Sequence, residues 1–152
     1  MILVCVTDQQ SCDRLIYAGY RLAQNRNEPL EVITVRPRIM GKCTDSSDCW
    51  LASPEIQYLT EITISLDAEL HFIFNDRPAE AIAQYIKNHK IKRLVTGVAP
   101  DGEISPFNQT IAERVPELLI YQVTESGTVI KPGQSLNKSQ ARRGRSVFDQ
   151  AN

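Results

Sequence analysis

The sequence lacks the features that mark several common classes of protein. It has no apolar run near the roughly 18 residues that suggest a membrane span. No basic residues precede the short apolar run at 2–6, as they would in a signal peptide. It contains no Walker loop, no Gly-x-Ser-x-Gly and no His-Glu-x-x-His motif. We therefore expect a cytoplasmic protein that is not an enzyme.

Histidine is scarce, and neither of the two histidines has an obvious catalytic partner. His71 alternates with Phe72 and Phe74 in a strand pattern, so we expect it to be packed. His89 stands at the polar end of a helix pattern, where we expect it to be solvated. General acid–base and nucleophilic catalysis both need a second group beside the histidine. The sequence shows none, and we assign no catalytic residue.

Paired cysteines are also missing. Cys43 and Cys49 enclose five residues, which is not the Cys-x-x-Cys spacing of a zinc site, and no histidine is near them in sequence. We expect reduced thiols and no metal there. Cys5 lies in an apolar run and is expected to be a buried structural thiol. Cys12 falls at a helix start, where the helix dipole would lower its pKa.

What is present is an ordinary globular composition in a chain of 152 residues, with 42% hydrophobic and 23% charged residues. One domain is the natural expectation. Residues 126–152 carry five basic side chains and one acidic, a net charge of +4, whereas residues 1–125 carry −5. We predict an α/β domain at 1–125 and a flexible basic tail at 126–152. Solubility is the favoured role of the tail, and a weak contact with nucleic acid or an acidic partner is the alternative.

Strand and helix patterns alternate along the domain. Apolar, β-branched stretches predict five strands, at 2–7, 30–35, 69–74, 93–98 and 118–123. Helices are expected at 11–25 and at 53–66. A third is expected to start at 76, with Asp76 as its cap, and a short fourth to end near 115. The polar segment 37–52 is expected to be a loop. Alternation of this kind predicts an α/β fold with a single open five-stranded parallel sheet, order 3-2-1-4-5, and helices on both faces.

In such a sheet, ligands bind beyond the carboxyl ends of the strands. The loop after the first strand begins with Thr7 and Asp8. The Asp8 carboxylate is suited to accept a hydrogen bond from an adenine or ribose donor. It is equally suited to cap the following helix, as is Ser11. Both roles stay open for Asp8.

The loop after the fourth strand is the second candidate segment. Gly97 permits close backbone approach where the strand ends. Ser105, followed by proline, resembles a helix cap, so free backbone N–H groups would face the cleft and suit a phosphate. Asp101 and Glu103 act against an anion, and the loop contains no Lys or Arg. A plain turn is the alternative reading of this loop.

These residues resemble the universal stress protein family. The order of elements over roughly residues 1–125, the strand ending in Thr7 and Asp8, and the stretch 93–97 before a short helix and Pro116 are all similar to the family pattern. Within the family, the chain looks closest to the stress-protein-like domain of osmosensitive potassium-channel sensor kinases, where a phenylalanine also opens the last helix, as Phe107 does. The resemblance implies a stress-response or signalling module.

The nucleotide motif of the family is only partly present. Gly97 matches its first glycine, but Pro100 stands at the second, so the triphosphate cradle looks degraded. The resemblance implies weak or absent ATP binding, with an adenine nucleotide or cyclic dinucleotide as a possible ligand and no required cofactor. The backbone near Val35 would hold the nucleoside with Thr7 and Asp8. The expected phosphate end consists of Gly97, Gly102, Ser105 and Asn108.

Two further readings stay open. A receiver domain would use a phosphorylatable aspartate after strand three, where Asp76 stands, and Asp8, Thr96 and Lys131 resemble its other parts. The single carboxylate after strand one and the position of Lys131 beyond strand five argue against it. A scaffold without ligand, working through protein contacts, is the other alternative. The family resemblance also implies a homodimer through the last strand, at 118–123, whose edge is expected to be exposed.

Overall fold

The computed structural model describes residues 1–7, 9–39, 53–98 and 104–133. One sheet of six strands forms its centre, in the order β3-β2-β1-β4-β5-β6. The first five strands are parallel, and β6 is antiparallel to β5. The strands are β1 (Ile2–Cys5), β2 (Leu30–Arg36), β3 (Leu70–Phe74), β4 (Arg93–Gly97), β5 (Leu119–Val123) and β6 (Val129–Ile130). The predicted parallel sheet and the order of its first five strands are confirmed.

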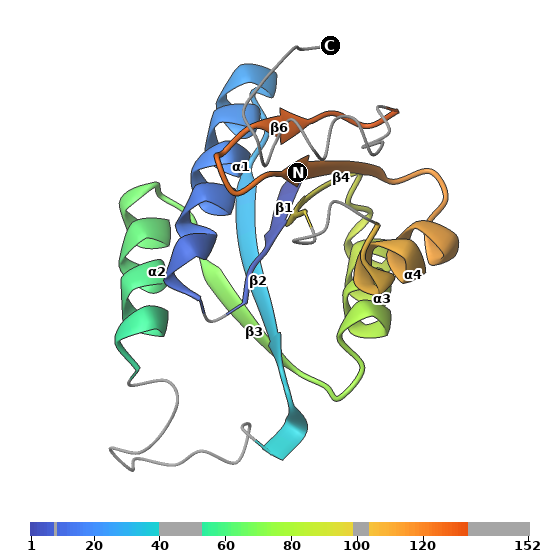
Figure 1. Cartoon of the computed structure of the whole chain (residues 1–152), viewed down its shortest axis with the longest axis horizontal. Coiled ribbons are helices and arrows are strands. Elements are labelled where there is room, and N and C mark those ends of the chain that lie inside the picture. Colours follow the sequence, from blue (N-terminus) through green and yellow to red (C-terminus); the bar gives the residue numbers. More distant parts are fainter. Residues whose placement is uncertain (8, 40–52, 99–103, 134–152) are drawn as a thin grey trace.

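Helices cover both faces of this sheet, as predicted (Figure 1). A short 3-10 helix, η1 (Gln10–Cys12), leads into α1 (Asp13–Arg26). The other helices are α2 (Pro54–Ser65), α3 (Pro78–His89) and α4 (Pro106–Arg114). Buried side chains of α1 and α2 pack on one face, and those of α3 and α4 pack on the other. The central strand β1 supplies Ile2 and Val4 to the first core and Leu3 to the second, as strand alternation requires.

Serine caps fix the start of two helices, as the sequence predicts. The Ser53 hydroxyl accepts a hydrogen bond from the N–H of Ile56, and that of Ser105 accepts one from the N–H of Asn108. Each serine is followed by a proline in the first helical turn, which lacks the N–H that would otherwise go unpaired there. These caps place the N-terminus of α4 at a definite point on the carboxyl side of β4.

The expected cap at Asp76 is wrong. The N-cap of α3 is Arg77, and its side chain makes no capping bond. Oδ1 of Asp76 instead accepts a hydrogen bond from the N–H of Arg38, at 3.0 Å. The N–H of Arg77 is satisfied by Oδ1 of Asn75, at 2.8 Å. Asp76 therefore ties the end of β3 to the segment after β2 and does not cap the helix.

The prediction of five strands also needs correction. Residues 129–130, placed in the expected tail, form β6 and pair with Gln122 and Val123 of β5. A turn with Gly127 at φ 91° closes this hairpin, and the N–H of Thr124 donates to the carbonyl of Thr128. A strand of two residues is too short to show a periodic pattern, so it could not be predicted from the sequence. The hairpin covers the C-terminal half of the β5 edge, which was expected to be exposed.

One glycine allows α1 to lie close to the sheet. A Cβ atom on Gly19 would stand 2.2 Å from Cγ2 of Val4, far inside contact distance. The position therefore needs glycine for packing and not for a turn. This close approach fixes the height of α1 above β1, and with it the position of the first turn of the helix at the carboxyl edge of the sheet.

The histidines lie on the α3 side of the molecule. His71 is half-buried and was expected to be packed; its Nε2 lies 2.9 Å from a carboxylate oxygen of Glu31 and 3.3 Å from one of Glu69. His89 is exposed, as expected, and its ring stacks on Tyr85 with centroids 4.0 Å apart. No helix among the described residues is long and apolar enough to cross a membrane.

Candidate functional site

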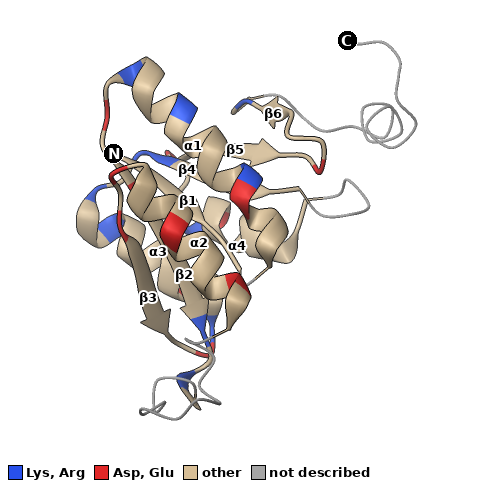
Figure 2. Ribbon diagram, turned by 90° about the vertical axis from the view of Figure 1, so that its left-hand side faces the viewer, with Lys and Arg blue, Asp and Glu red and all other residues tan. Residues whose placement is uncertain are grey.

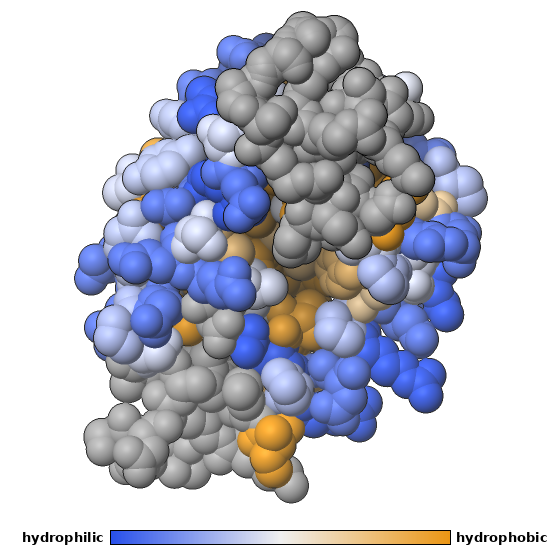
Figure 3. Space-filling view, viewed as in Figure 1, coloured by the Kyte–Doolittle hydropathy of each residue, from blue (hydrophilic) through white to orange (hydrophobic). Residues whose placement is uncertain are grey.

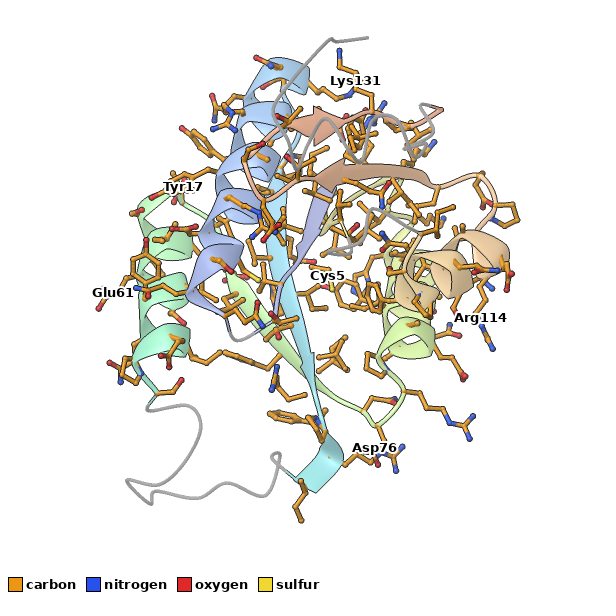
Figure 4. All side chains as sticks on the ribbon, viewed as in Figure 1. Cys5, Tyr17, Glu61, Asp76, Arg114 and Lys131 are labelled. Carbon is orange, nitrogen blue, oxygen red and sulfur yellow. The ribbon has the colours of Figure 1, made fainter. Side chains whose placement is uncertain are left out.

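A cavity of about 430 Å³ opens where β1 and β4 end. β2 is the neighbour of β1 on one side and β4 on the other. The loops that follow β1 and β4 therefore diverge at this point and leave a hollow. Figure 3 shows apolar residues gathered in a recess near the middle of this face, where Figure 4 places Cys5. Its lining comprises Cys5, Val6, Thr7, Gln9, Cys12, Arg14, Leu15, Val35, Pro78, Thr96, Gly97, Val98, Ser105, Phe107 and Asn108.

The structure brings together every predicted site residue that it describes. All five of these line this one cavity, namely Thr7, Val35, Gly97, Ser105 and Asn108. The remaining two, Asp8 and Gly102, lie outside the described residues, as do the acidic Asp101 and Glu103.

Two buried polar side chains in the wall of the cavity have no hydrogen-bond partner in the described part of the chain. Asn108 is 4% exposed and Thr96 is 3% exposed. Both amide atoms of Asn108 and the hydroxyl of Thr96 lack a hydrogen bond among the described residues. Leaving a buried polar group unpaired costs about 1–3 kcal/mol, so folded proteins rarely do it. Polar groups of this kind beside a cavity are what a ligand with its own donors and acceptors would satisfy.

Sequence reasoning missed the cation of this site, Arg14 in the first turn of α1. Its Nε donates to the carbonyl oxygen of Thr124, at 2.9 Å, and its Nη1 donates to that of Ser11. A Cβ atom on Gly97 would lie 3.6 Å from Nη2 of Arg14, so the guanidinium reaches the floor of the cavity. The β5–β6 hairpin supplies the Thr124 carbonyl, and thus helps to hold the arginine in place.

Arg14 changes the electrostatics expected of the cleft. Its side chain donates to two backbone carbonyls, which orient the guanidinium but do not neutralise its charge. Leu15, Val35 and Phe107 make the surrounding wall largely apolar. The signal was present in the sequence: the first turn of a helix that follows strand one must start at the carboxyl edge.

Two cysteines also line the cavity. Cys12, buried at the start of α1, places its sulfur 3.5 Å from the backbone nitrogen of Thr7. Burial, with a smaller contribution from Cys12, raises the pKa of Cys5 to about 12. The Cys5 thiol therefore stays protonated at neutral pH. Its side chain is only partly buried and lines the cavity, so the expectation of a fully buried residue is wrong. Cys43 and Cys49 lie outside the described residues, and the described part of the chain holds no cluster of three or more metal-ligating side chains.

The arrangement of a receiver domain is not found. Receivers have the sheet order 2-1-3-4-5, with strand three in the interior. Here β3 stands at the edge of the sheet. Asp76 follows it and lies apart from Cys5 in Figure 4, and β2 and β1 stand between β3 and β4, the strand that holds Thr96. Asp76 and Thr96, proposed as parts of one phosphoacceptor site, are therefore separated.

Comparison with solved structures identifies the fold. A universal stress protein from Archaeoglobus fulgidus superposes with a TM-score of 0.59 and 16% identity, covering 81% of this chain and 90% of its own. A universal stress protein in complex with cAMP gives 0.60 and 14%, covering 82% and 95%. One from Lactobacillus plantarum gives 0.53 and 15%, covering 81% and 94%. No family model and no curated protein matches the sequence. The chain therefore has the fold of universal stress proteins.

Proposed function

We propose that this protein is a non-catalytic stress-response module that binds an adenine nucleotide with one phosphate group, and binds ATP weakly or not at all. The observation that carries the proposal is the pair of unpartnered buried side chains, Asn108 and Thr96, in the wall of the cavity. A solved structure of the same fold holds cAMP, which also has a single phosphate. The volume of about 430 Å³ lies within the usual range for small-molecule sites.

The phosphate end is assigned to Arg14 and the N-terminus of α4. An arginine offers two N–H groups in a plane to a phosphate, and a helix N-terminus adds backbone N–H groups and a partial positive charge. Ser105 and Asn108 stand at that helix start. One arginine and one helix end balance a charge between −1 and −2, as a monophosphate carries. A triphosphate would leave further charge unbalanced, beside a loop that holds Asp101 and Glu103.

The nucleoside end is assigned to the other side of the cavity. Val35 and Leu15 offer an apolar surface for a flat base, and Thr7 adds polar groups. We retain Asp8, which neighbours Thr7 in sequence, as the partner of a ribose or adenine donor. The Asp8→Ala change is expected to weaken nucleotide binding by about 1–3 kcal/mol. An unchanged affinity would remove Asp8 from the site.

Calorimetric titration of the whole chain tests the proposal. AMP, cAMP, a cyclic dinucleotide, adenosine and ATP are added separately to the same preparation. We expect AMP or cAMP to bind at least about tenfold tighter than both adenosine and ATP, a difference of about 1.4 kcal/mol. Tighter binding of ATP that Gly97→Ala weakens, and which therefore occurs in this cavity, would contradict the proposal. Binding of none of the five would favour the scaffold that works only through protein contacts.

Gly97→Ala is the matched variant for this titration. The added Cβ would meet Arg14 and Leu15 at 3.6–3.9 Å, an ordinary contact distance, so the fold has room for it. It would nonetheless occupy the floor of the cavity. We expect weaker AMP binding with an unchanged midpoint of urea unfolding. Unaltered affinity would show that the ligand does not approach the end of β4.

The proposal extends to family and assembly. We infer membership of the universal stress protein family, with greatest similarity to the domain found in osmosensitive potassium-channel sensor kinases. We also propose a homodimer through β5, at the part of its edge that β6 leaves uncovered, where Leu119 is 38% exposed. Light scattering at micromolar concentration tests this, and a monomeric mass would contradict the dimer.

A further inference from the structure

A second cavity lies at the opposite end of the sheet. It has a volume of about 560 Å³ and is bounded by the end of α3, the starts of β4 and β5, and the segment after α4. Arg93 and Gly97, at the two ends of β4, line the second and the first cavity respectively. Four steps of roughly 3.3 Å separate them, about 13 Å in all. We call this second hollow the amino-end pocket, and its lining comprises Ile86, Lys87, Lys90, Ile91, Lys92, Arg93, Val115, Glu117 and Leu119.

The amino-end pocket is strongly basic within an otherwise acidic domain. Four of its nine lining residues are cations and one, Glu117, is an anion. The cations Lys87, Lys90 and Lys92 are exposed. In Figure 2, basic segments at the end of α3 and in the turn that follows lie beside the N-terminus of the chain. Charge of one sign gathered around a hollow raises the local concentration of ions of the opposite sign.

The requirements of the helix explain only part of this charge. A lysine in the last turn of a helix, such as Lys87, is favoured by the helix dipole. Lys90 ends α3 in the left-handed conformation, φ 55°, where glycine is favoured. Lys92 and Arg93 lie beyond the helix and gain nothing from its dipole.

Arg93 supplies a second, independent observation. Its side chain is 15% exposed, and its Nη1 pairs with a carboxylate oxygen of Glu28 at 2.9 Å. Its Nε is buried and has no hydrogen-bond partner among the described residues. Glu28 is also shared with Arg26, so it does not neutralise Arg93 alone. The wall of the pocket thus holds an arginine whose charge and hydrogen-bonding capacity are only partly satisfied.

We propose that the amino-end pocket binds a polyphosphate group, either free or carried by a nucleotide. Three linked phosphates bring several negative charges into one small volume, as four clustered cations require. In an extended acidic peptide, carboxylates on the same side of the chain stand roughly 6.6 Å apart, which matches this cluster less well. The lysines serve as mobile point charges and Arg93 as the more rigid group at the wall.

Titration of the whole chain with inorganic tripolyphosphate at low salt tests this proposal. We expect saturable binding of one molecule per chain, weakened at least tenfold by the double change Lys90→Gln and Lys92→Gln. Arg114→Gln removes an exposed cation of α4 that does not line the pocket, and should change the affinity less than twofold. Absence of saturable binding, or equal loss in Arg114→Gln, would overturn the proposal. Binding of a DNA oligonucleotide without tripolyphosphate binding would overturn it as well.

The Gly97→Ala variant distinguishes the amino-end pocket from the first cavity, which lies at the carboxyl ends of β1 and β4 and is called the carboxyl-end cavity below. Tripolyphosphate binding should survive that change and AMP binding should not, so the two proposals fail separately. ATP separates the two sources of the group. If ATP binds as tightly as tripolyphosphate and loses affinity in the double lysine variant, the pocket accepts a polyphosphate carried by a nucleotide. If ATP binds much more weakly, the ligand is free polyphosphate. Loss of tripolyphosphate binding in Gly97→Ala would place the anion in the first cavity and contradict the assignment.

Discussion

The two ends of the sheet hold their cations in different ways. At the carboxyl end, one guanidinium is fixed by two backbone carbonyls inside a largely apolar cavity. Beside it lie buried polar groups that no described residue pairs with. At the amino end, three exposed lysines and one arginine surround an open hollow. A fixed cation with matched polar groups selects a ligand by shape. A cluster of mobile cations selects by charge, and salt weakens it more because exposed charges are screened.

The largest expected effect comes from disturbing the packing of α1 on β1, which positions the carboxyl-end cavity. Gly19→Ala would drive a Cβ into Val4, whose side chain is fully buried, and push α1 away from β1. We expect the free energy of unfolding to fall by about 3 kcal/mol, the upper part of the usual range for overpacking. Urea denaturation measures this. Because the amino-end pocket has no lining residue from α1, its tripolyphosphate affinity should be retained under conditions where the variant is folded. A stability equal to that of the unmodified chain would contradict the close packing.

The next effect concerns the fixed cation. Arg14→Gln should weaken AMP binding by about tenfold to a hundredfold, the usual loss for a hydrogen bond to a charged group, and should leave adenosine binding unchanged. Arg21→Gln, an exposed arginine farther along the same helix, is the control and should alter neither. Calorimetry measures all four affinities. Equal losses for AMP and adenosine would show that Arg14 does not contact the phosphate.

A smaller effect is a pH dependence of stability that comes from Cys5 in the carboxyl-end cavity. The Cys5 thiol has a pKa of about 12 in the folded chain and an ordinary value of 9.0, so the unfolded state loses this proton first. Stability should therefore fall as pH rises from 9 towards 12, and Cys5 contributes about 1 kcal/mol of that fall by pH 10. Urea unfolding of the unmodified chain and of Cys5→Ala at pH 8 and pH 10 isolates this contribution. The same pH dependence in both proteins would contradict it.

The smallest effect tests whether the unpaired hydroxyl at Thr96 serves a ligand. Thr96→Val and Thr34→Val each remove a buried hydroxyl that has no partner among the residues the structure describes, and each should raise the free energy of unfolding by about 1 kcal/mol. Thr34 does not line the cavity and is the control. Only Thr96→Val should weaken AMP binding, by a few fold. Equal AMP affinity in both variants would remove Thr96 from the site.

The sequence predicted most of the fold because its signals there are strong and local. The five apolar stretches and the capping serines, Ser53 and Ser105, each follow from a few neighbouring residues. The two-residue β6 was missed because pairing with β5, and not its own pattern, makes it a strand. Asp76 was misassigned because its partner, Arg38, lies 38 positions away in the sequence.

The site was partly predictable for a related reason. Parallel topology brings the ends of β1 and β4 together, so Thr7, Gly97 and Asn108 could be placed at one edge from the order of elements alone. The topology also places Arg14 at this edge, in the first turn of α1, but the carbonyl of Thr124 that orients its side chain comes from the unpredicted hairpin. Nor does a sequence reveal that Asn108 is buried without partners, since this depends on every group packed around it.

The side-chain amide of Asn108 offers the most direct test that the carboxyl-end cavity is a nucleotide site. Its N–H pair can be followed by NMR in the ¹⁵N-labelled chain while AMP is added, with Asn108→Asp used to assign the signal. We predict that the signal shifts and that its exchange with water slows on saturation, because the nucleotide supplies the missing partner. An Asn108 signal unchanged at saturating AMP would contradict the account.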